Sequence, residues 1–220
     1  MKIFLDTAHI ESIEYYASLG IIDGITTNPT NLSKATGNPT QTIQKICALL
    51  PDCPVNVEVT HEEPQAVYSQ ALAIHKMASN IVVKIPCHEK YYPVIKQLVQ
   101  EGVSINITLV FSLLQSLMMC KLGVDFISPF VGRLDDIDSD GIGLLNEIRL
   151  MIDMYEYKTK ILAASIRSID DLHEALLAGA DIATLPMNVL EKAIKHPLTD
   201  EGIKQFLNDW DKTGYDSFPE

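Results

Sequence analysis

The sequence predicts an α/β fold, a (β/α)8 or TIM barrel with an extra C-terminal helix. Three observations point to it. Eight short apolar runs recur along the 220 residues, longer stretches with helical periodicity separate them, and no low-complexity linker interrupts the chain. Alternating strands and helices are typical of a parallel sheet covered by helices. We therefore expect a single barrel domain over residues 1–220, of which 199–220 form a C-terminal helical extension.

The expected strands are rich in Ile, Val, Leu and Phe, as parallel strands buried on both faces are. They lie at residues 2–6, 22–27, 54–59, 81–86, 104–110, 124–130, 159–165 and 181–185. A barrel usually takes about 250 residues, so this one is compact. An open doubly wound sheet is the alternative, but it favours a GxGxxG loop after an early strand, and the sequence contains none.

The expected helices have one apolar face and recognisable ends. Residues 43, 46, 47 and 50 are apolar at the i, i+3, i+4, i+7 spacing, and Asn38 followed by Pro39 supplies the N-cap and the first helical position. Ser168 can cap a later helix, and Gly179 suits the left-handed backbone that ends it.

The extension at 199–220 carries an apolar stripe at residues 203, 206, 207 and 210, again with helical spacing. Two interpretations stay open at this point. The helix folds back onto its own barrel, or it forms an arm that packs on a neighbouring subunit.

The composition excludes several classes of function. The formal net charge is −12 and the isoelectric point is about 4.8, which is unsuited to binding nucleic acid or an anionic membrane. An anionic substrate would need a local cluster of positive side chains. No stretch approaches the ~18 apolar residues that span a bilayer. The N-terminus reaches an acid, Asp6, too early for a signal peptide.

The four cysteines (positions 47, 53, 87 and 120) form no CxxC pair, and no two histidines have metal-ligand spacing. We expect reduced thiols in a cytoplasmic protein. A metal-dependent reaction is disfavoured because no histidine falls at a strand end.

Polar residues gather where the strands end, which is where a barrel places its chemistry. Residues two apart on a strand point to the same face, as Asn106 and Thr108 do. Polar groups in a barrel mouth are costly to bury unless they pair or act on a ligand. In chain order these positions are Asp6, Asn28, Asn56, Glu58, Lys84, Asn106, Thr108, Ser128 and Ser165.

Lys84 is the residue on which the functional prediction depends. It stands in the apolar run IVVKIP. In one interpretation its stem lies on apolar surface and its amine reaches water. In the other, desolvation favours the neutral amine, which is the form that attacks a ketone. Asp6 and Glu58 at the same mouth supply groups for acid–base catalysis and favour the second interpretation.

Two of the only three arginines, Arg133 and Arg167, follow the sixth and seventh strands. Guanidinium groups bind phosphate oxygens bidentately, so two arginines at one rim of an acidic protein indicate a phosphate clamp. The alternative is that they form ion pairs with Asp135, Asp136 or Asp170.

Six segments, in this order, resemble signatures of the transaldolase family, in particular its short single-domain branch, which is close to fructose 6-phosphate aldolase. They are DGITTNPT (23–30), VVKIP (82–86), INITLVFS (105–112), ISPFVGRLDDID (127–138), AASIRS (163–168) and HPLTDEGIKQFLNDW (196–210). The resemblance covers nearly the whole chain.

The resemblance implies transfer of a dihydroxyacetone unit through a Schiff base on Lys84. The donor would be sedoheptulose 7-phosphate or fructose 6-phosphate, and the acceptor glyceraldehyde 3-phosphate or erythrose 4-phosphate, as in the pentose phosphate pathway. Glu58 and Thr108 would move protons through a water, and Asp6 would take the proton of the C4 hydroxyl. The implied substrate ligands are Asn28, Asn106, Ser128, Phe130, Arg133, Ser165 and Arg167. No cofactor is implied, and the expected partners are sugar phosphates and other copies of the chain, in a pentamer or decamer.

The resemblance also bears on two rival functions. Fructose 6-phosphate aldolase, the sister enzyme, typically has glutamine at the position of Glu58 and tyrosine at that of Phe130. A tyrosine hydroxyl could supply a proton and release the fragment, whereas phenylalanine cannot, so transfer is expected here. A barrel that binds sugar phosphate without catalysis should have lost part of the set Lys84, Asp6 and Glu58, and all three are present.

The sequence departs from the family's pattern at three places near these motifs. Leu113 and Leu114 are bulkier than the small residues common after FS. Asn31 stands where the family usually has an aliphatic residue, and CHEKYYP (87–93) follows the lysine strand in place of the usual threonine and glycine-containing turn. These departures leave loop shape and acceptor preference open.

Overall fold

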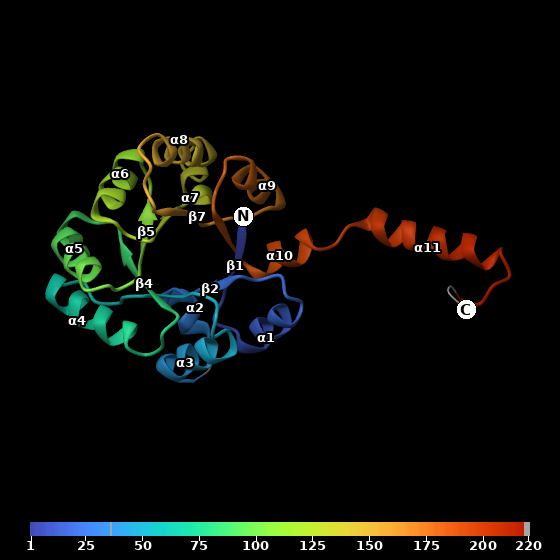
Figure 1. The fold of residues 1–220 in the computed structure, drawn as a ribbon, viewed down its shortest axis with the longest axis horizontal. Coiled ribbons are helices and arrows are strands. Elements are labelled where there is room, and N and C mark those ends of the chain that lie inside the picture. Colours follow the sequence, from blue (N-terminus) through green and yellow to red (C-terminus); the bar gives the residue numbers. More distant parts are fainter. Residues whose placement is uncertain (36, 218–220) are drawn as a thin grey trace.

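Eight parallel strands close into a barrel in the computed structural model of this chain, which describes residues 1–35 and 37–217 (Figure 1). Each strand pairs with its neighbours in sequence order, and β8 (Ile182–Leu185) closes the ring by pairing with β1 (Lys2–Asp6). The predicted (β/α)8 fold is therefore confirmed, and the open-sheet alternative is wrong.

The eight strands coincide with the eight apolar runs, with ends shifted by a residue or two. The remaining six are β2 (Gly24–Thr26), β3 (Val55–Glu58), β4 (Ile81–Pro86), β5 (Ile105–Val110), β6 (Phe126–Pro129) and β7 (Lys160–Ala163). In the register of β3, β4 and β5, Glu58 lies beside Lys84 and Lys84 beside Asn106. The pairing of the strands thus brings polar residues from separate motifs into adjacent positions.

Helices surround the barrel in chain order, as Figure 1 shows. They are α1 (Ile10–Ser18), α2 (Pro29–Lys34), α3 (Pro39–Leu49), α4 (Pro64–His75), the short 3-10 helix η1 (Glu89–Tyr91), α5 (Tyr92–Gln100), α6 (Leu113–Leu122), α7 (Val131–Asp135), α8 (Gly141–Met154), α9 (Ile169–Leu177) and α10 (Met187–Ala193). The last helix, α11 (Pro197–Asp211), lies outside this ring.

The predicted helix ends are found where the sequence places them. Asn38 Oδ1 accepts the Thr40 amide at 2.9 Å and so caps α3. Ser168 begins α9 in a capping box with Asp171, which satisfies two backbone amides that would otherwise lack partners. Gly179, just beyond α9, has the positive φ of 78° expected of a helix stop.

The core has two parts, one between the barrel and its helices and one inside the barrel. The inner part is small and contains Phe4, Leu162, Ala164 and Ile182. Phe4 precedes Asp6 by two residues on β1, so both side chains point to the barrel interior. A Cβ added at Gly24 would lie 2.6 Å from the Phe4 ring, which explains the glycine there. The aromatic ring fills the barrel below the polar mouth.

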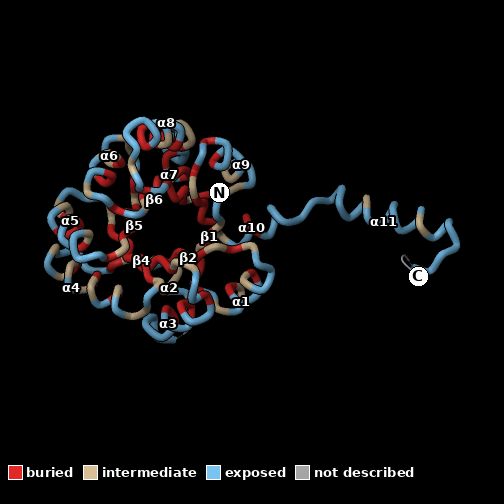
Figure 2. Tube along the Cα trace, viewed as in Figure 1, coloured by how far each residue is buried: buried red, intermediate tan, exposed pale blue. Residues whose placement is uncertain are grey.

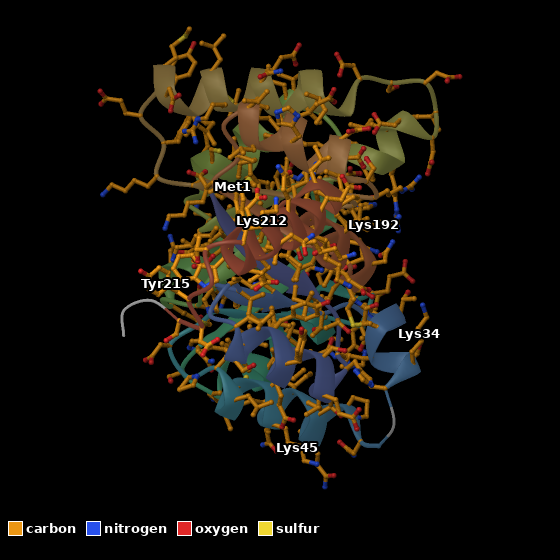
Figure 3. The ribbon with its side chains drawn as sticks, turned by 90° about the vertical axis from the view of Figure 1, so that its right-hand side faces the viewer. Met1, Lys34, Lys45, Lys192, Lys212 and Tyr215 are labelled. Carbon is orange, nitrogen blue, oxygen red and sulfur yellow. The ribbon has the colours of Figure 1, made fainter. Side chains whose placement is uncertain are left out.

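Helix α11 extends away from the barrel, so the interpretation in which it folds back onto its own barrel is wrong (Figure 1). None of its residues is buried, and Figure 2 shows it mostly exposed. Figure 3 views the molecule from the side of α11, with Met1 toward one end of the barrel and Lys34 of α2 toward the other. Ile203, Phe206 and Leu207 of α11 are therefore exposed in the single chain.

Two further predictions concern the chain as a whole. All four cysteines are free, as expected from their spacing. Among the described helices, none combines the length and the apolar character needed to cross a bilayer.

Candidate active site

A cavity of about 390 Å³ opens at the C-terminal ends of the strands. Every strand contributes to its lining, through Asp6, Thr26, Glu58, Lys84, Thr108, Ser128, Leu162 and Thr184. The segments that follow the strands add Asn28, Asn31, Phe130, Arg133 and Ser165. Of the predicted site residues, the cavity lining lacks only Asn106 and Arg167.

Lys84, on β4, lines this cavity and is buried. Its side chain is 7% exposed, and its Nζ lies 3.1 Å from Glu58 Oε2. The same nitrogen donates a hydrogen bond of 3.0 Å to the backbone carbonyl of Thr27. The amine therefore lies between two acceptors. The apolar surroundings that the run IVVKIP predicts concern the aliphatic part of the Lys84 side chain and do not extend to its amine. The carboxylate is close enough to exchange a proton with the amine directly.

Asp6 ends β1 and faces the same cavity. Its Oδ1 accepts from Asn31 Nδ2 at 2.9 Å, from Thr26 Oγ1 at 3.1 Å and from Asn28 Nδ2 at 3.4 Å. Burial raises the pKa of this carboxyl above its ordinary value, and the Lys84 charge and the hydrogen bonds only partly oppose that effect. Asp6 is therefore a carboxyl suited to taking and giving a proton.

Three buried polar side chains on β3, β5 and β6 are linked to one another by hydrogen bonds. Asn56 Nδ2 donates to the carbonyl of Ile25 at 3.1 Å, Asn106 Nδ2 donates to Asn56 Oδ1 at 2.9 Å, and Ser128 Oγ donates to Asn106 Oδ1 at 2.8 Å. Asn106 is fully buried, whereas Ser128 lines the cavity. Asn106 thus fixes the orientation of Ser128 in this structure.

The two predicted phosphate arginines differ in their surroundings. Arg133 lines the cavity, and its guanidinium carbon lies 5.1 Å from the centre of the Phe130 ring. Arg167 pairs through both terminal nitrogens with the carboxylate of Asp136, and this hydrogen bonding holds the pKa of Asp136 below its usual range. The ion pair that was the alternative for Arg167 is therefore present, while Arg133 faces the cavity.

The loops that carry these arginines are joined through their backbones. Gly132 N donates to the carbonyl of Ser165 at 3.2 Å, and Val131 N to that of Ala164 at 3.0 Å. A Cβ added at Gly132 would lie 2.5 Å from the Ser165 oxygen, so only glycine permits this approach. Ser165 itself has a positive φ of 61°, an uncommon conformation for serine.

Three lining residues that take part in the hydrogen bonds around Asp6 were not assigned a role from the sequence. Thr184 Oγ1 lies 2.6 Å from Thr26 Oγ1, and because Thr26 donates its single proton to Asp6, Thr184 must donate to Thr26. Asn31 is the third. Thr184 could have been found, because it is a polar residue near the end of the last strand. The contact of Asn31 with Asp6 had no sequence signal.

A second cavity of about 800 Å³ adjoins the first and shares Asp6 and Asn31 with it. The β1–α1 loop, α2, α3 and α10 line its other sides.

Within the described part of the chain, no cluster of three or more His, Cys, Asp or Glu residues could hold a metal ion.

The sequence is similar to known proteins over almost its whole length. Residues 3–216 match the family model described as Transaldolase/Fructose-6-phosphate aldolase. The chain is 48% identical over 210 residues to a probable transaldolase of Lactiplantibacillus plantarum, covering 96% of each chain. It is 44% identical over 214 residues to a probable transaldolase of Rhizobium meliloti, covering 97% of this chain and 98% of the relative.

Solved structures of distant sequence share the fold. A provisionally named fructose-1,6-biphosphate aldolase from Coccidioides immitis superposes with a TM-score of 0.60 at 12% identity, covering 90% of this chain and 81% of the other. Thiamine phosphate pyrophosphorylase from Pyrococcus furiosus gives a TM-score of 0.57 at 18% identity, covering 84% and 85%. At these identities the likeness concerns the barrel alone.

The raised pKa of Asp6 leads to a prediction about stability. Burial disfavours the ionised carboxylate in the folded protein, so Asp6→Asn should raise the free energy of unfolding at pH 7 by about 0.5–2 kcal/mol. The gain should shrink as pH falls toward 4, because the wild-type carboxyl then binds a proton more readily when folded than when unfolded. Urea unfolding at both pH values measures it, with the exposed Asp200→Asn as control. A gain that grew in acid would contradict this account.

Proposed function

This chain belongs to the transaldolase/fructose-6-phosphate aldolase family, and from that premise we propose that it is a transaldolase acting through a Schiff base on Lys84. It moves a dihydroxyacetone unit from sedoheptulose 7-phosphate or fructose 6-phosphate to glyceraldehyde 3-phosphate or erythrose 4-phosphate, a pentose phosphate pathway reaction in the cytoplasm. The observation that supports it most is the buried amine of Lys84 at 3.1 Å from Glu58.

The first half of the reaction forms the imine. Lys84 Nζ, after giving a proton to Glu58, attacks the C2 carbonyl carbon of the ketose. The carbinolamine then loses its hydroxyl as water, and Glu58 returns the proton, with Thr108 holding a water beside it. The distance between Nζ and Oε2 supports direct proton exchange between the first two groups.

The second half breaks and remakes a carbon–carbon bond. Asp6 takes the proton of the C4 hydroxyl, the C3–C4 electron pair moves toward the protonated imine, and the aldose leaves. The retained three carbons are an enamine on Lys84. An incoming aldose phosphate is attacked by C3 of the enamine, Asp6 returns its proton to the new hydroxyl, and water releases the product ketose. The raised pKa of Asp6 supports both proton transfers.

The remaining predicted ligands divide between the two ends of the substrate. Asn28 and Ser128 line the cavity and hydrogen-bond the hydroxyls of the three-carbon unit, with Asn106 supporting Ser128 from below. Arg133 and Ser165 bind the phosphate, and Arg167 joins them by exchanging its bond to Asp136.

Phe130 supports transfer over simple cleavage. Its ring lines the cavity, packs edge-to-face with Phe111 at 5.8 Å between centroids and lies under Arg133. It offers no hydroxyl that could protonate the enamine, so the three-carbon unit is held until an acceptor arrives.

We propose that α11 is an arm that packs on a second copy of the chain, within the homo-oligomer of five or ten subunits that the resemblance implied. Ile203, Phe206 and Leu207 lie on one face of this helix and are 53–74% exposed in the single chain. A contiguous apolar face of this kind is costly to leave in water and marks a contact with another protein.

Trapping the imine tests the role of Lys84. Borohydride reduction with fructose 6-phosphate should add a three-carbon unit to the peptide that contains Lys84, because reduction fixes the intermediate left after cleavage. Peptide mass mapping locates the adduct. Lys84→Met should give none and should lose transfer activity by at least about 10³-fold. An adduct on another lysine, or full activity of Lys84→Met, would refute the mechanism.

The acceptor requirement separates transfer from cleavage. With fructose 6-phosphate alone, we expect turnover to stop after about one equivalent of enzyme, and erythrose 4-phosphate to restore it, since the enamine of a transferase awaits an aldehyde. Aldehyde release is measured over time. Phe130→Tyr should increase the rate without acceptor. Sustained release of dihydroxyacetone by the wild type would make it an aldolase.

Shortening the chain tests the arm. Removal of residues 199–220 should give a smaller assembly by light scattering, because the apolar face of α11 is lost with them. Phe206→Glu should act in the same direction, whereas Gln205→Glu, with the same added charge on the opposite face, should leave the mass unchanged. An assembly of unaltered mass after truncation would exclude the arm.

A further inference from the structure

The Asp6 carboxylate is held by one of its two oxygens. All three side-chain donors, Asn31, Thr26 and Asn28, point at Oδ1, and the bond from Asn31 is the shortest at 2.9 Å. Among the residues described, no donor reaches Oδ2 within hydrogen-bond distance. The carboxylate is thus held through Oδ1, while Oδ2 has no donor among the described residues.

Asn31 is placed for this contact by the start of α2. Asn28 caps the helix by accepting the Asn31 backbone amide at 2.8 Å, and Pro29 fixes the first helical position. The cap therefore holds Asn31 against the end of β1, at the boundary between the two cavities. From this position the side-chain amide of Asn31 reaches Asp6 Oδ1.

We propose that Asn31 is a positioning residue whose amide holds Oδ1 of Asp6 and leaves Oδ2 to take the proton of the C4 hydroxyl. The catalytic part of this statement rests on the proposed function, whereas the effect on Asp6 does not. An aliphatic side chain at this position could not donate the bond.

The groups around Asp6 show how the side-chain amide of Asn31 contributes to the ionisation of this carboxyl. Within the first cavity, Lys84 favours the ionised carboxyl and Glu58 disfavours it, while burial disfavours it most. The second cavity brings His9 and Glu11 from the β1–α1 region, Lys34 from α2 and Glu191 from α10 to its other side. The bonds from Asn31 and Thr26 stabilise the ionised form that a general base needs.

Removing the amide tests the inference at two levels. Asn31→Leu keeps the size and loses the donor, and Ser33→Ala, an exposed change on the same helix, is the matched control. The first measurement is a carbon-13 NMR titration of the Asp6 carboxyl in the free protein, assigned with Asp6→Asn. We expect the Asp6 pKa to rise in Asn31→Leu and to stay in place in Ser33→Ala, because only the former loses a donor to the carboxylate.

The second measurement is the pH profile of kcat/KM for transfer. A base whose pKa is raised is ionised only at higher pH, so the acid limb should move upward, with about a tenfold loss below it and a smaller loss at high pH. A uniform loss at all pH values would indicate a merely structural role, and a change in KM alone a substrate contact. Either result would overturn the proposal.

The two measurements separate this inference from the proposed function. If the titration of Asp6 is the same in Asn31→Leu and wild type, Asn31 does not act on Asp6, whatever the activity. If the titration shifts but the wild type transfers no three-carbon unit, the action on Asp6 stands, while the proposed function and the catalytic part of the inference fail together.

Discussion

The contact between Lys84 and Glu58 is the interaction on which the rest of the mouth depends. A lysine head buried to 7% exposure needs a charged partner and further acceptors, since an isolated ammonium inside a protein is very costly. Adjacent register on β3 and β4 supplies the carboxylate, and the end of β2 supplies the carbonyl of Thr27. In the proposed reaction, proton exchange between the paired groups leaves the amine able to attack a carbonyl carbon.

Burying charged groups at this mouth lowers the free energy of unfolding, and apolar packing in the rest of the fold offsets that loss. Burial disfavours the ionised form of Asp6, and three donors are gathered on one of its oxygens to oppose that effect. Below the mouth, Phe4 and its neighbours fill the barrel with apolar side chains. Charged groups held at a cost above an apolar interior are the arrangement expected of a functional site.

The arginine side of the cavity is built differently, from loops rather than strands. Gly132 lets the segment after β6 approach that after β7 closely enough for backbone hydrogen bonds, so Arg133 and Ser165 face one space. Arg167 stays paired with Asp136. This side can therefore adjust to a ligand by exchanging an ion pair, whereas the side of Lys84 is fixed by the strands.

The sequence by itself determined the eight strands, the capped helices and the placing of Lys84, Glu58 and Ser128 at one mouth. Each follows from local periodicity, because side-chain direction repeats every two residues in a strand and every three or four in a helix. Tertiary structure alone decided the bond between Asn31 and Asp6, 25 residues apart, the pairing of Arg167 with Asp136, 31 apart, and the direction of α11. Such contacts depend on how loops and helices pack once the barrel is closed, and no local pattern records that packing.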